Sequence, residues 1–345
     1  MVRVLLVDDS ATARALMGAI LRSDPELEVV GEAKDGEQGV ELTKRLRPNL
    51  VLMDFQMPRV DGFEATRMIM SEAPTPIVVM SGTLDTRDVM VSMDAMRAGA
   101  LAVVAKPPAP QSLEFERECR YLLSTIKSMA QVRTVRRIAS AGLPSGETPI
   151  ARPRAAALGD KKRLVAMVAS TGGPAALHRI LTELPATFPA PILVVQHIAL
   201  GFADGLAGWL DKSCKLTVKV AQHGEALQPR TVYLSPDNRH LGVGAGDTIV
   251  ISDGPPIGGF RPSGSFLFET VAKQVGSAAV GLILTGMGDD GVAGLRALRD
   301  SGGLVLAQDE ESSVVFGMPR AAIQAGLPDQ VVSLSLVSAR LNELV

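Results

Sequence analysis

Acidic side chains stand directly after apolar runs in the first third of the chain. Asp8 and Asp9 follow the run 2–7, and Asp54 follows the run 50–53. A parallel sheet gathers the carboxyl ends of its strands at one edge, so we expect these carboxylates to lie close together. Crowded carboxylates repel one another, and their hard oxygen atoms suit a cation such as Mg²⁺. We predict a cation site at which Asp54 acts as a nucleophile toward a phosphoryl donor.

Two further polar residues end later apolar runs. Ser81 follows the run 76–80, and Lys106 follows the run 101–105 and precedes Pro107. An ammonium group stabilises charge on a transferred phosphoryl group, and a hydroxyl donates to one of its oxygens. A single aspartate at a strand end, such as Asp9, is more often a turn or helix cap. Five such residues at consistent strand ends favour a phosphorylation site.

A serine begins a second group of residues with chemical potential. Ser170 lies between the apolar run 164–168 and the helical stretch 175–183, in the sequence Ala-Ser-Thr-Gly-Gly-Pro. At a strand-to-helix turn a hydroxyl projects above the sheet, and amides at the helix N-terminus can stabilise an oxyanion. The motif differs from the Gly-x-Ser-x-Gly elbow of α/β-hydrolases. By itself it fits either a catalytic nucleophile or a turn that cradles a phosphate.

A nucleophilic serine needs a general base and a carboxylate that orients that base. His197 directly follows the run 192–196, at the sheet edge where Ser170 is expected, whereas we assign His178, His223 and His240 to surface or packing positions. Asp289 and Asp290 follow the run 280–284, within a glycine-rich turn. Spacing does not choose between these two aspartates, and we expect the unused one to cap the following helix.

The elements that must position these residues alternate apolar runs with helical spacing. We predict strands at 2–7, 28–32, 50–53, 76–80 and 101–105, and helices at 12–22, 37–46, 62–71, 86–97 and 112–130. A second series of strands is predicted at 164–168, 192–195, 232–234, 248–251, 280–284 and 304–307, with part of 214–251 antiparallel. The fold class is therefore α/β with two doubly wound domains, a five-stranded parallel one and a mostly parallel one.

Composition bounds the remaining possibilities. A chain of 345 residues usually forms more than one core, and 46% hydrophobic with 21% charged residues argues against disorder. A net charge of −2 implies no large basic surface for nucleic acid. Two cysteines give no disulfide framework or metal spacing, which favours a reducing compartment. Since apolar runs fall short of the roughly 20 residues that span a bilayer and no signal peptide is evident, we expect a cytoplasmic protein without membrane insertion.

The first group of motifs strongly resembles response-regulator receiver domains, which have a flavodoxin-like fold. The resemblance covers residues 1–125 and rests on four segments: Leu-Val-Asp-Asp-Ser at 6–10, Met-Asp-Phe-Gln-Met-Pro-Arg-Val-Asp-Gly at 53–62, Ser-Gly-Thr at 81–83 and Ala-Lys-Pro at 105–107. It implies Mg²⁺ ligation by Asp8 or Asp9, by Asp54 and by the carbonyl of Gln56, with phosphorylation of Asp54 by a histidine kinase. One departure is Val103, where the family usually has an aromatic residue.

The second group resembles the catalytic domain of the chemotaxis receptor methylesterase family over residues 162–345. Besides the serine and histidine motifs, the similar segments are 233–241, 261–263, 307–310 and 315–322. The resemblance implies a triad of Ser170, His197 and Asp290, with Thr171 and the backbone of Met287 at the oxyanion site. It further implies hydrolysis of glutamyl methyl esters on chemoreceptors, deamidation of receptor glutamines in some members, and no cofactor in this domain.

The two resemblances together define the predicted organisation. We expect a receiver domain at 1–125, a linker rich in basic residues, Pro and Gly at 126–161, and a catalytic domain at 162–345, activated by phosphorylation of Asp54. The family often has a Met-Pro-Pro turn where this chain has 198–200, and an aspartate at the position of Ser265. The alternative function is a non-enzymatic, phosphorylation-dependent module that binds a receptor.

Overall fold

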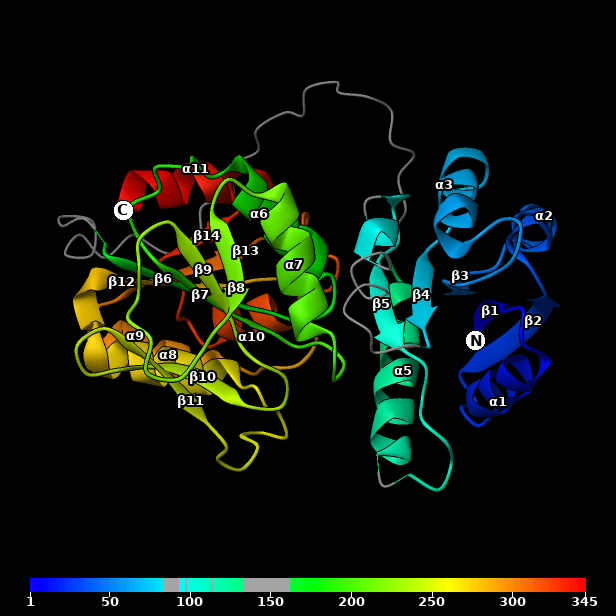
Figure 1. The fold of residues 1–345 in the computed structure, drawn as a ribbon, viewed down its shortest axis with the longest axis horizontal. Coiled ribbons are helices and arrows are strands. Elements are labelled where there is room, and N and C mark those ends of the chain that lie inside the picture. The colour runs from blue at the N-terminus through cyan, green and yellow to red at the C-terminus, as the bar shows by residue number, and fades with distance from the viewer. Residues whose placement is uncertain (83–92, 97, 113, 133–161) are drawn as a thin grey trace. The chain divides into compact units, whose positions relative to one another are not determined.

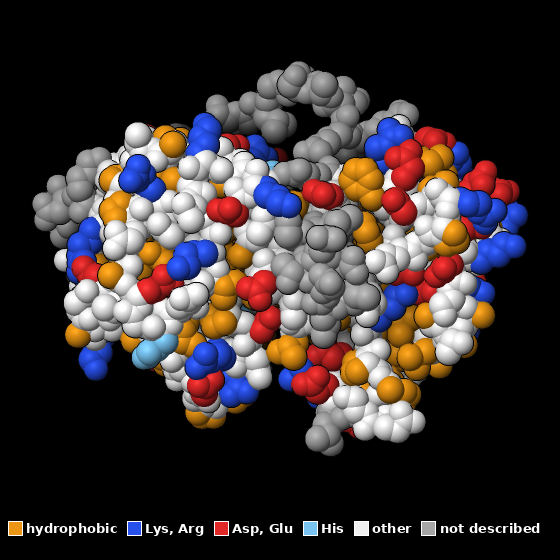
Figure 2. All heavy atoms as spheres, viewed as in Figure 1, with side chains coloured by type: hydrophobic (Ala, Val, Ile, Leu, Met, Phe, Trp, Pro, Cys, Tyr) orange, Lys and Arg blue, Asp and Glu red, His pale blue; other side chains and the backbone are white. Residues whose placement is uncertain are grey.

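The computed structural model describes residues 1–82, 93–96, 98–112, 114–132 and 162–345. The chain divides into two compact units, Met1–Gly146 and Glu147–Val345 (Figure 1). Acidic and basic side chains are interspersed on the face drawn in Figure 2. Within the described part of the chain, every helix is too short or too polar to cross a bilayer.

The first unit is built on a five-stranded sheet of order β2-β1-β3-β4-β5 in which all pairs are parallel. This confirms the predicted flavodoxin-like arrangement. The predicted helix at 86–97 lies mostly outside the described residues. The elements are β1 (Val2–Val7), α1 (Ala11–Arg22), β2 (Leu27–Ala33), α2 (Gly36–Leu46), β3 (Leu50–Asp54), α3 (Gly62–Glu72), β4 (Ile77–Ser81), β5 (Ala102–Ala105) and α5 (Phe115–Met129).

Local sequence explains where these elements begin and which faces they bury. Strands β3 and β4 are buried along their whole length, as expected for central strands covered on both faces. Ser10, Asp35 and Asp61 each accept a backbone hydrogen bond as the N-cap of the following helix. Helix α5 is amphipathic and continues to Met129, which is fully buried.

The second unit contains a seven-stranded parallel sheet of order β14-β13-β12-β6-β7-β9-β8 and an antiparallel hairpin, β10-β11. The predicted antiparallel part is confirmed for the hairpin, whereas β8 and β9 are parallel. The elements are β6 (Leu164–Ala169), α6 (Gly173–Glu183), β7 (Ile192–Gln196), α7 (Ala203–Ser213), β8 (Thr217–Val220), β9 (Thr231–Leu234), β10 (His240–Gly244), β11 (Thr248–Ser252), α8 (Gly264–Gln274), the 3₁₀ turn η2 (Gly276–Ala278), β12 (Ala279–Ile283), α9 (Val292–Asp300), β13 (Leu304–Gln308), α10 (Met318–Gln324), β14 (Gln330–Val332) and α11 (Leu334–Leu344).

Helices cover both faces of this sheet. Figure 1 shows α6, α7 and α11 on one face and α8 and α9 on the other. The hairpin packs on α8, and Leu241, Val243, Ile249 and Ile251 join the core formed by α8 and the central strands. Strands β6, β7 and β12 end side by side at the sheet's carboxyl edge, between these two layers of helices.

Candidate active site and acidic cluster

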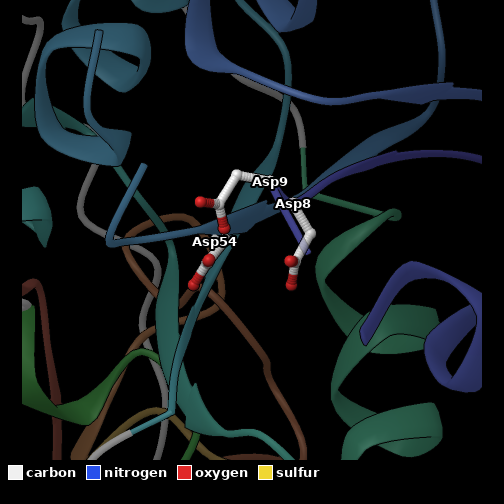
Figure 3. Close-up of side chains that lie close together, drawn as sticks. All are labelled: Asp8, Asp9 and Asp54. Carbon is white, nitrogen blue, oxygen red and sulfur yellow. The ribbon is translucent and has the colours of Figure 1, made fainter. Parts of the chain in front are cut away.

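Three carboxylates meet at the carboxyl edge of the first sheet. Asp8 and Asp9 follow β1, Asp54 ends the neighbouring strand β3, and one oxygen of each lies within 4.8 Å of the others (Figure 3). Asp8 and Asp54 are buried, while Asp9 is exposed. The structure thus brings together the carboxylates that the sequence pattern had placed at strand ends.

Lys106 lies within ion-pairing distance of this cluster. Its Nζ lies 2.7 Å from Asp8 Oδ2 and 3.0 Å from Asp54 Oδ1. Burial raises the pKa of Asp54, and the repulsion of Asp8 and Asp9 adds to this, so the attraction of Lys106 only partly offsets the rise. Burial also opposes the charge on Lys106, but its hydrogen bonds to Asp8 and Asp54 outweigh that effect and raise its pKa. Lysine therefore stays charged beside the carboxylates.

The donor set fits a hard divalent cation. Among the residues that the structure describes, three carboxylates converge around the single ammonium group of Lys106, and oxygen ligands of this kind are those that Mg²⁺ prefers. Ser81 ends β4, is buried, and accepts the amide of Lys106 with its carbonyl (2.9 Å). Gln56 belongs to an open pocket next to the cluster, lined by Asp9, Phe55, Gln56, Met57, Pro58 and Asp61.

In the second unit, Ser170 and His197 emerge next to each other from paired strands. Ala169 of β6 lies opposite Gln196 of β7, and the amide of His197 donates to the carbonyl of Ala169 (2.9 Å). The Gln196 side chain also joins the two segments, because its Nε2 donates to the carbonyls of Ser170 (2.8 Å) and His197 (2.7 Å). Sequence reasoning did not identify this role of Gln196.

His197 and Asp290 form a buried imidazole–carboxylate pair. His197 Nε2 lies 2.9 Å from Asp290 Oδ2, and both side chains are almost completely buried. A carboxylate only accepts hydrogen bonds, so Nε2 carries the proton and Nδ1 of the neutral ring carries a lone pair. That Nδ1 atom is buried and has no hydrogen-bond partner among the described residues. The imidazole is therefore held in the tautomer that can accept a proton through Nδ1.

Asp290 is fixed by the N-terminus of α8. It accepts hydrogen bonds from the Ser263 hydroxyl (2.7 Å) and from the amides of Gly264 (2.6 Å) and Ser265 (3.2 Å). Burial tends to raise the pKa of Asp290, but the hydrogen bonds from His197, Gly264 and Ser263 outweigh it and hold that pKa below its ordinary value. The carboxylate is therefore ionised at neutral pH.

The neighbouring aspartate has a different position from the one expected. Asp289 is exposed, and the N-cap of α9 is Gly291, which has a φ of 97° and provides no side-chain cap. The prediction that the unused aspartate caps the following helix is therefore wrong. A glycine is needed there because the left-handed conformation turns the chain directly from Asp290 into α9.

The turn after Ser170 leads directly into α6. Thr171 is buried and its carbonyl accepts from Thr285 Oγ1 (2.9 Å), while Gly172 (φ 79°) is the N-cap of α6. On the other side of the serine, a methyl group at Gly286 would come within 2.7 Å of Ser170 Cβ. The next residue, Met287, is half exposed at the rim. Backbone from both segments thus borders the serine.

Two contacts at this site had no sequence signal that singled them out. The Phe260 ring stacks on the His197 ring with centroids 4.5 Å apart and an interplanar angle of 16°. Ser263 is fully buried and donates to Asp290, although the sequence suggested only that it belongs to a family-like segment. Both residues come from the loop between the hairpin and α8. Their contacts with His197 and Asp290 join segments that are far apart in the sequence, so no local pattern indicates them.

Comparisons with known proteins agree with these two units. The family model described as CheB methylesterase matches residues 165–341, and the response regulator receiver domain matches residues 4–115. Protein-glutamate methylesterase/protein-glutamine glutaminase 4 of Myxococcus xanthus is 53% identical over 340 residues, covering 99% of this chain and 96% of that protein. Protein-glutamate methylesterase/protein-glutamine glutaminase 3 of Anaeromyxobacter dehalogenans is 50% identical over 344 residues, covering 99% of this chain and 98% of that protein.

A solved structure supports the fold of the second unit. The crystal structure of the Thermotoga maritima CheB methylesterase catalytic domain is 40% identical, has a TM-score of 0.52, and matches over 54% of this chain and all of that one. Fold and site define a response regulator whose second unit is an α/β hydrolytic domain. The chain belongs to the CheB methylesterase family, which confirms the resemblance seen in the sequence.

Proposed function

We propose that this protein hydrolyses glutamyl methyl esters on chemoreceptors with Ser170, His197 and Asp290 as its catalytic triad. The observation that carries the proposal is the buried His197–Asp290 pair, which leaves Nδ1 of His197 unpartnered beside the strand end that bears Ser170. The names of the relatives, which describe protein-glutamate methylesterases and protein-glutamine glutaminases, supply the substrate class.

The proposed reaction proceeds through an acyl-enzyme. Nδ1 of His197 takes the hydroxyl proton as Ser170 Oγ attacks the ester carbonyl. Collapse of the tetrahedral intermediate breaks the bond to the methoxy oxygen, which receives that proton and leaves as methanol. Water then attacks the acyl carbon, His197 removes its proton, and the glutamate and free Ser170 are released. Asp290 stabilises the imidazolium formed in each half, and no cofactor takes part.

The oxyanion of both tetrahedral intermediates needs hydrogen-bond donors. We assign this role to the backbone around Thr171 and Met287, because these segments flank Ser170 and Thr171 leads into the N-terminus of α6. Helix N-terminal amides carry partial positive charge and are already oriented before the reaction begins.

The first unit supplies control in this proposal. Asp54 accepts a phosphoryl group from a histidine kinase of a chemosensory pathway, and phosphorylation raises the esterase activity. Mg²⁺ would be held by Asp8, Asp9, Asp54 and the carbonyl of Gln56, and when bound it neutralises charge on the transferred group. Lys106 and Ser81 bind phosphoryl oxygens, and Lys106 is already placed between Asp8 and Asp54. We place the protein in the cytoplasm together with that kinase.

The proposed domain boundaries are 1–125, 126–161 and 162–345. The amide of Lys162 donates to the carbonyl of Leu344 (2.8 Å), which supports a second domain that begins at residue 162. Residues 126–129 complete α5, so the first residues assigned to the linker continue the last receiver helix.

The test is methanol release from methylated chemoreceptor membranes by the full chain. Ser170→Ala should lower turnover by about 10⁶-fold, as loss of a triad nucleophile does in a well-studied protease. Ser213→Ala is a matched control, since Ser213 ends α7 and its hydroxyl donates to the carbonyl of Trp209 in the preceding turn of that helix (3.0 Å). Methanol release by Ser170→Ala at the wild-type rate would refute the proposal.

The same assay distinguishes two further readings of the protein. Release of ammonia from receptor glutamines by wild type but not by Ser170→Ala would show that deamidation uses the same acyl-enzyme. A non-enzymatic receptor-binding module would release neither product and would be unaffected by Ser170→Ala. The buried His197–Asp290 pair argues against that alternative, because a binding module has no need of an oriented base.

A further inference from the structure

A second buried histidine lies behind the carboxylate of the triad. His240 begins β10, is 1% exposed, and stacks on Phe266 with ring centroids 4.9 Å apart. The sequence had suggested only a surface or packing role for it. Its two ring nitrogens instead make defined hydrogen bonds to the segment that leads into α8.

The partners of His240 fix one neutral tautomer. The amide of Ser263 donates to Nδ1 (3.2 Å), and Nε2 lies 3.0 Å from the carbonyl oxygen of Pro255. A backbone amide cannot accept and a carbonyl cannot donate, so Nδ1 must carry the lone pair and Nε2 the proton. A charged imidazolium would turn an N–H toward the Ser263 amide and lose that bond.

Ser263 connects this imidazole to the triad. Its hydroxyl accepts from the amide of Ser265 (3.2 Å) and donates to Asp290 Oδ1 (2.7 Å), while Asp290 Oδ2 accepts from His197. His240 therefore holds the backbone of the residue whose side chain orients the triad carboxylate. The buried path runs from His240 through Ser263 and Asp290 to His197.

We propose that His240 is a positioning residue for catalysis: as a neutral imidazole it holds Ser263, which sets the orientation of Asp290 and hence of the His197 base. The inference rests on the proposed triad. If His240 only packed in the core, losing the hydrogen bond at Nδ1 would affect kcat no more than losing the one at Nε2. A positioning histidine acts through Nδ1 alone, because only Nδ1 faces Ser263.

Two amide substitutions separate the two nitrogens. The side-chain oxygen of asparagine can occupy the place of Nδ1 and accept from Ser263, whereas the terminal amide of glutamine reaches the place of Nε2 and donates to Pro255. His240→Asn should therefore keep most of the activity. His240→Gln should lower kcat on methylated receptor membranes by about 10²-fold, as a small misplacement of catalytic groups does, with KM little changed.

The chain offers a matched control for this substitution. His223 Nδ1 also accepts a backbone amide, that of Ile251 (3.1 Å), but His223 is exposed on a turn, and its hydrogen bond leads to strand β11 and not to Ser263. His223→Gln should leave kcat at the wild-type value. The proton shared by His197 and Asp290 gives a second readout, because its downfield NMR resonance should shift or broaden in His240→Gln and not in His223→Gln.

The outcomes separate this inference from the proposed function. Equal kcat values for His240→Asn and His240→Gln would overturn the positioning role, while full activity of Ser170→Ala would overturn the triad itself. The wild-type protein provides a test that does not depend on the folding of a variant. With ¹⁵N-labelled histidine, an unprotonated Nδ1 on His240 at neutral pH is expected, and a protonated Nδ1 would refute the proposal.

Discussion

The substitution Asp290→Asn tests the catalytic geometry most directly. The carboxylate accepts four hydrogen bonds: Oδ1 from the Ser263 hydroxyl and the Ser265 amide, and Oδ2 from His197 and the Gly264 amide. An asparagine must place an NH₂ group where one of these oxygens was. Each oxygen faces a backbone N–H, so either orientation sets a donor against a donor.

The consequence for catalysis depends on the orientation that the new amide adopts. With NH₂ toward His197, Nε2 becomes an acceptor and the proton moves to Nδ1, so the ring can no longer take the Ser170 proton. A change of tautomer of this kind costs about 10⁴-fold in kcat in serine proteases, which is about 5.5 kcal/mol of transition-state stabilisation. The unpaired backbone amide should cost a further 1–3 kcal/mol, roughly, of folding stability.

Methanol release at saturating methylated receptor measures the loss of kcat. The matched control is Asp289→Asn, the same change at the adjacent, exposed carboxylate, which should stay near the wild-type kcat. Denaturant unfolding measures the loss of folding stability. It can be followed by the fluorescence of Trp209, the single tryptophan of the chain, which lies in α7 of the second unit. If NMR shows Nε2 of His197 unprotonated in Asp290→Asn, a kcat within tenfold of wild type, or a loss equal to that of Asp289→Asn, would refute the assigned geometry.

Three further predictions concern control, the base and pH. Asp54→Asn should abolish stimulation by a small-molecule phosphodonor and leave basal methanol release unchanged; stimulation that survives would exclude Asp54 as the acceptor. Phe260→Leu removes the ring stacked on His197 and should lower kcat by about tenfold at most; an unaltered kcat would show that the stack is dispensable. Since the pKa of Asp290 is depressed by folding, its contribution to stability is present above the unfolded pKa of about 3.9 and lost as pH falls through the folded value. The stability difference between wild type and Asp290→Asn, followed by Trp209 fluorescence, should therefore shrink in acid, and a constant difference would contradict the depressed pKa.

Much of the fold follows from local sequence. Strands such as β3, β6 and β12 are buried along their whole length and therefore read as apolar runs, and polar residues at or just after their ends mark the functional edge. Strands β8, β10 and β14 were not predicted. Strands β8 and β14 are short and only partly buried, and the buried β10 contains two glycines, so their sequences lack a strong period.

The sequence by itself determined which residues end the central strands, and hence the two sheets, the acidic cluster and the presence of Ser170 and His197 at one edge. Local spacing left Asp289 and Asp290 equivalent, because two adjacent carboxylates in a glycine-rich turn have the same local signal, and only the family resemblance favoured Asp290. The hydrogen bonds that Ser263 and Gly264 donate to Asp290 come from the tertiary structure, in which the loop 253–263 and the start of α8 lie against that carboxylate. No sequence signal indicated the contacts of Phe260, Ser263 and His240 at this site, because each contact joins segments that are distant in the sequence.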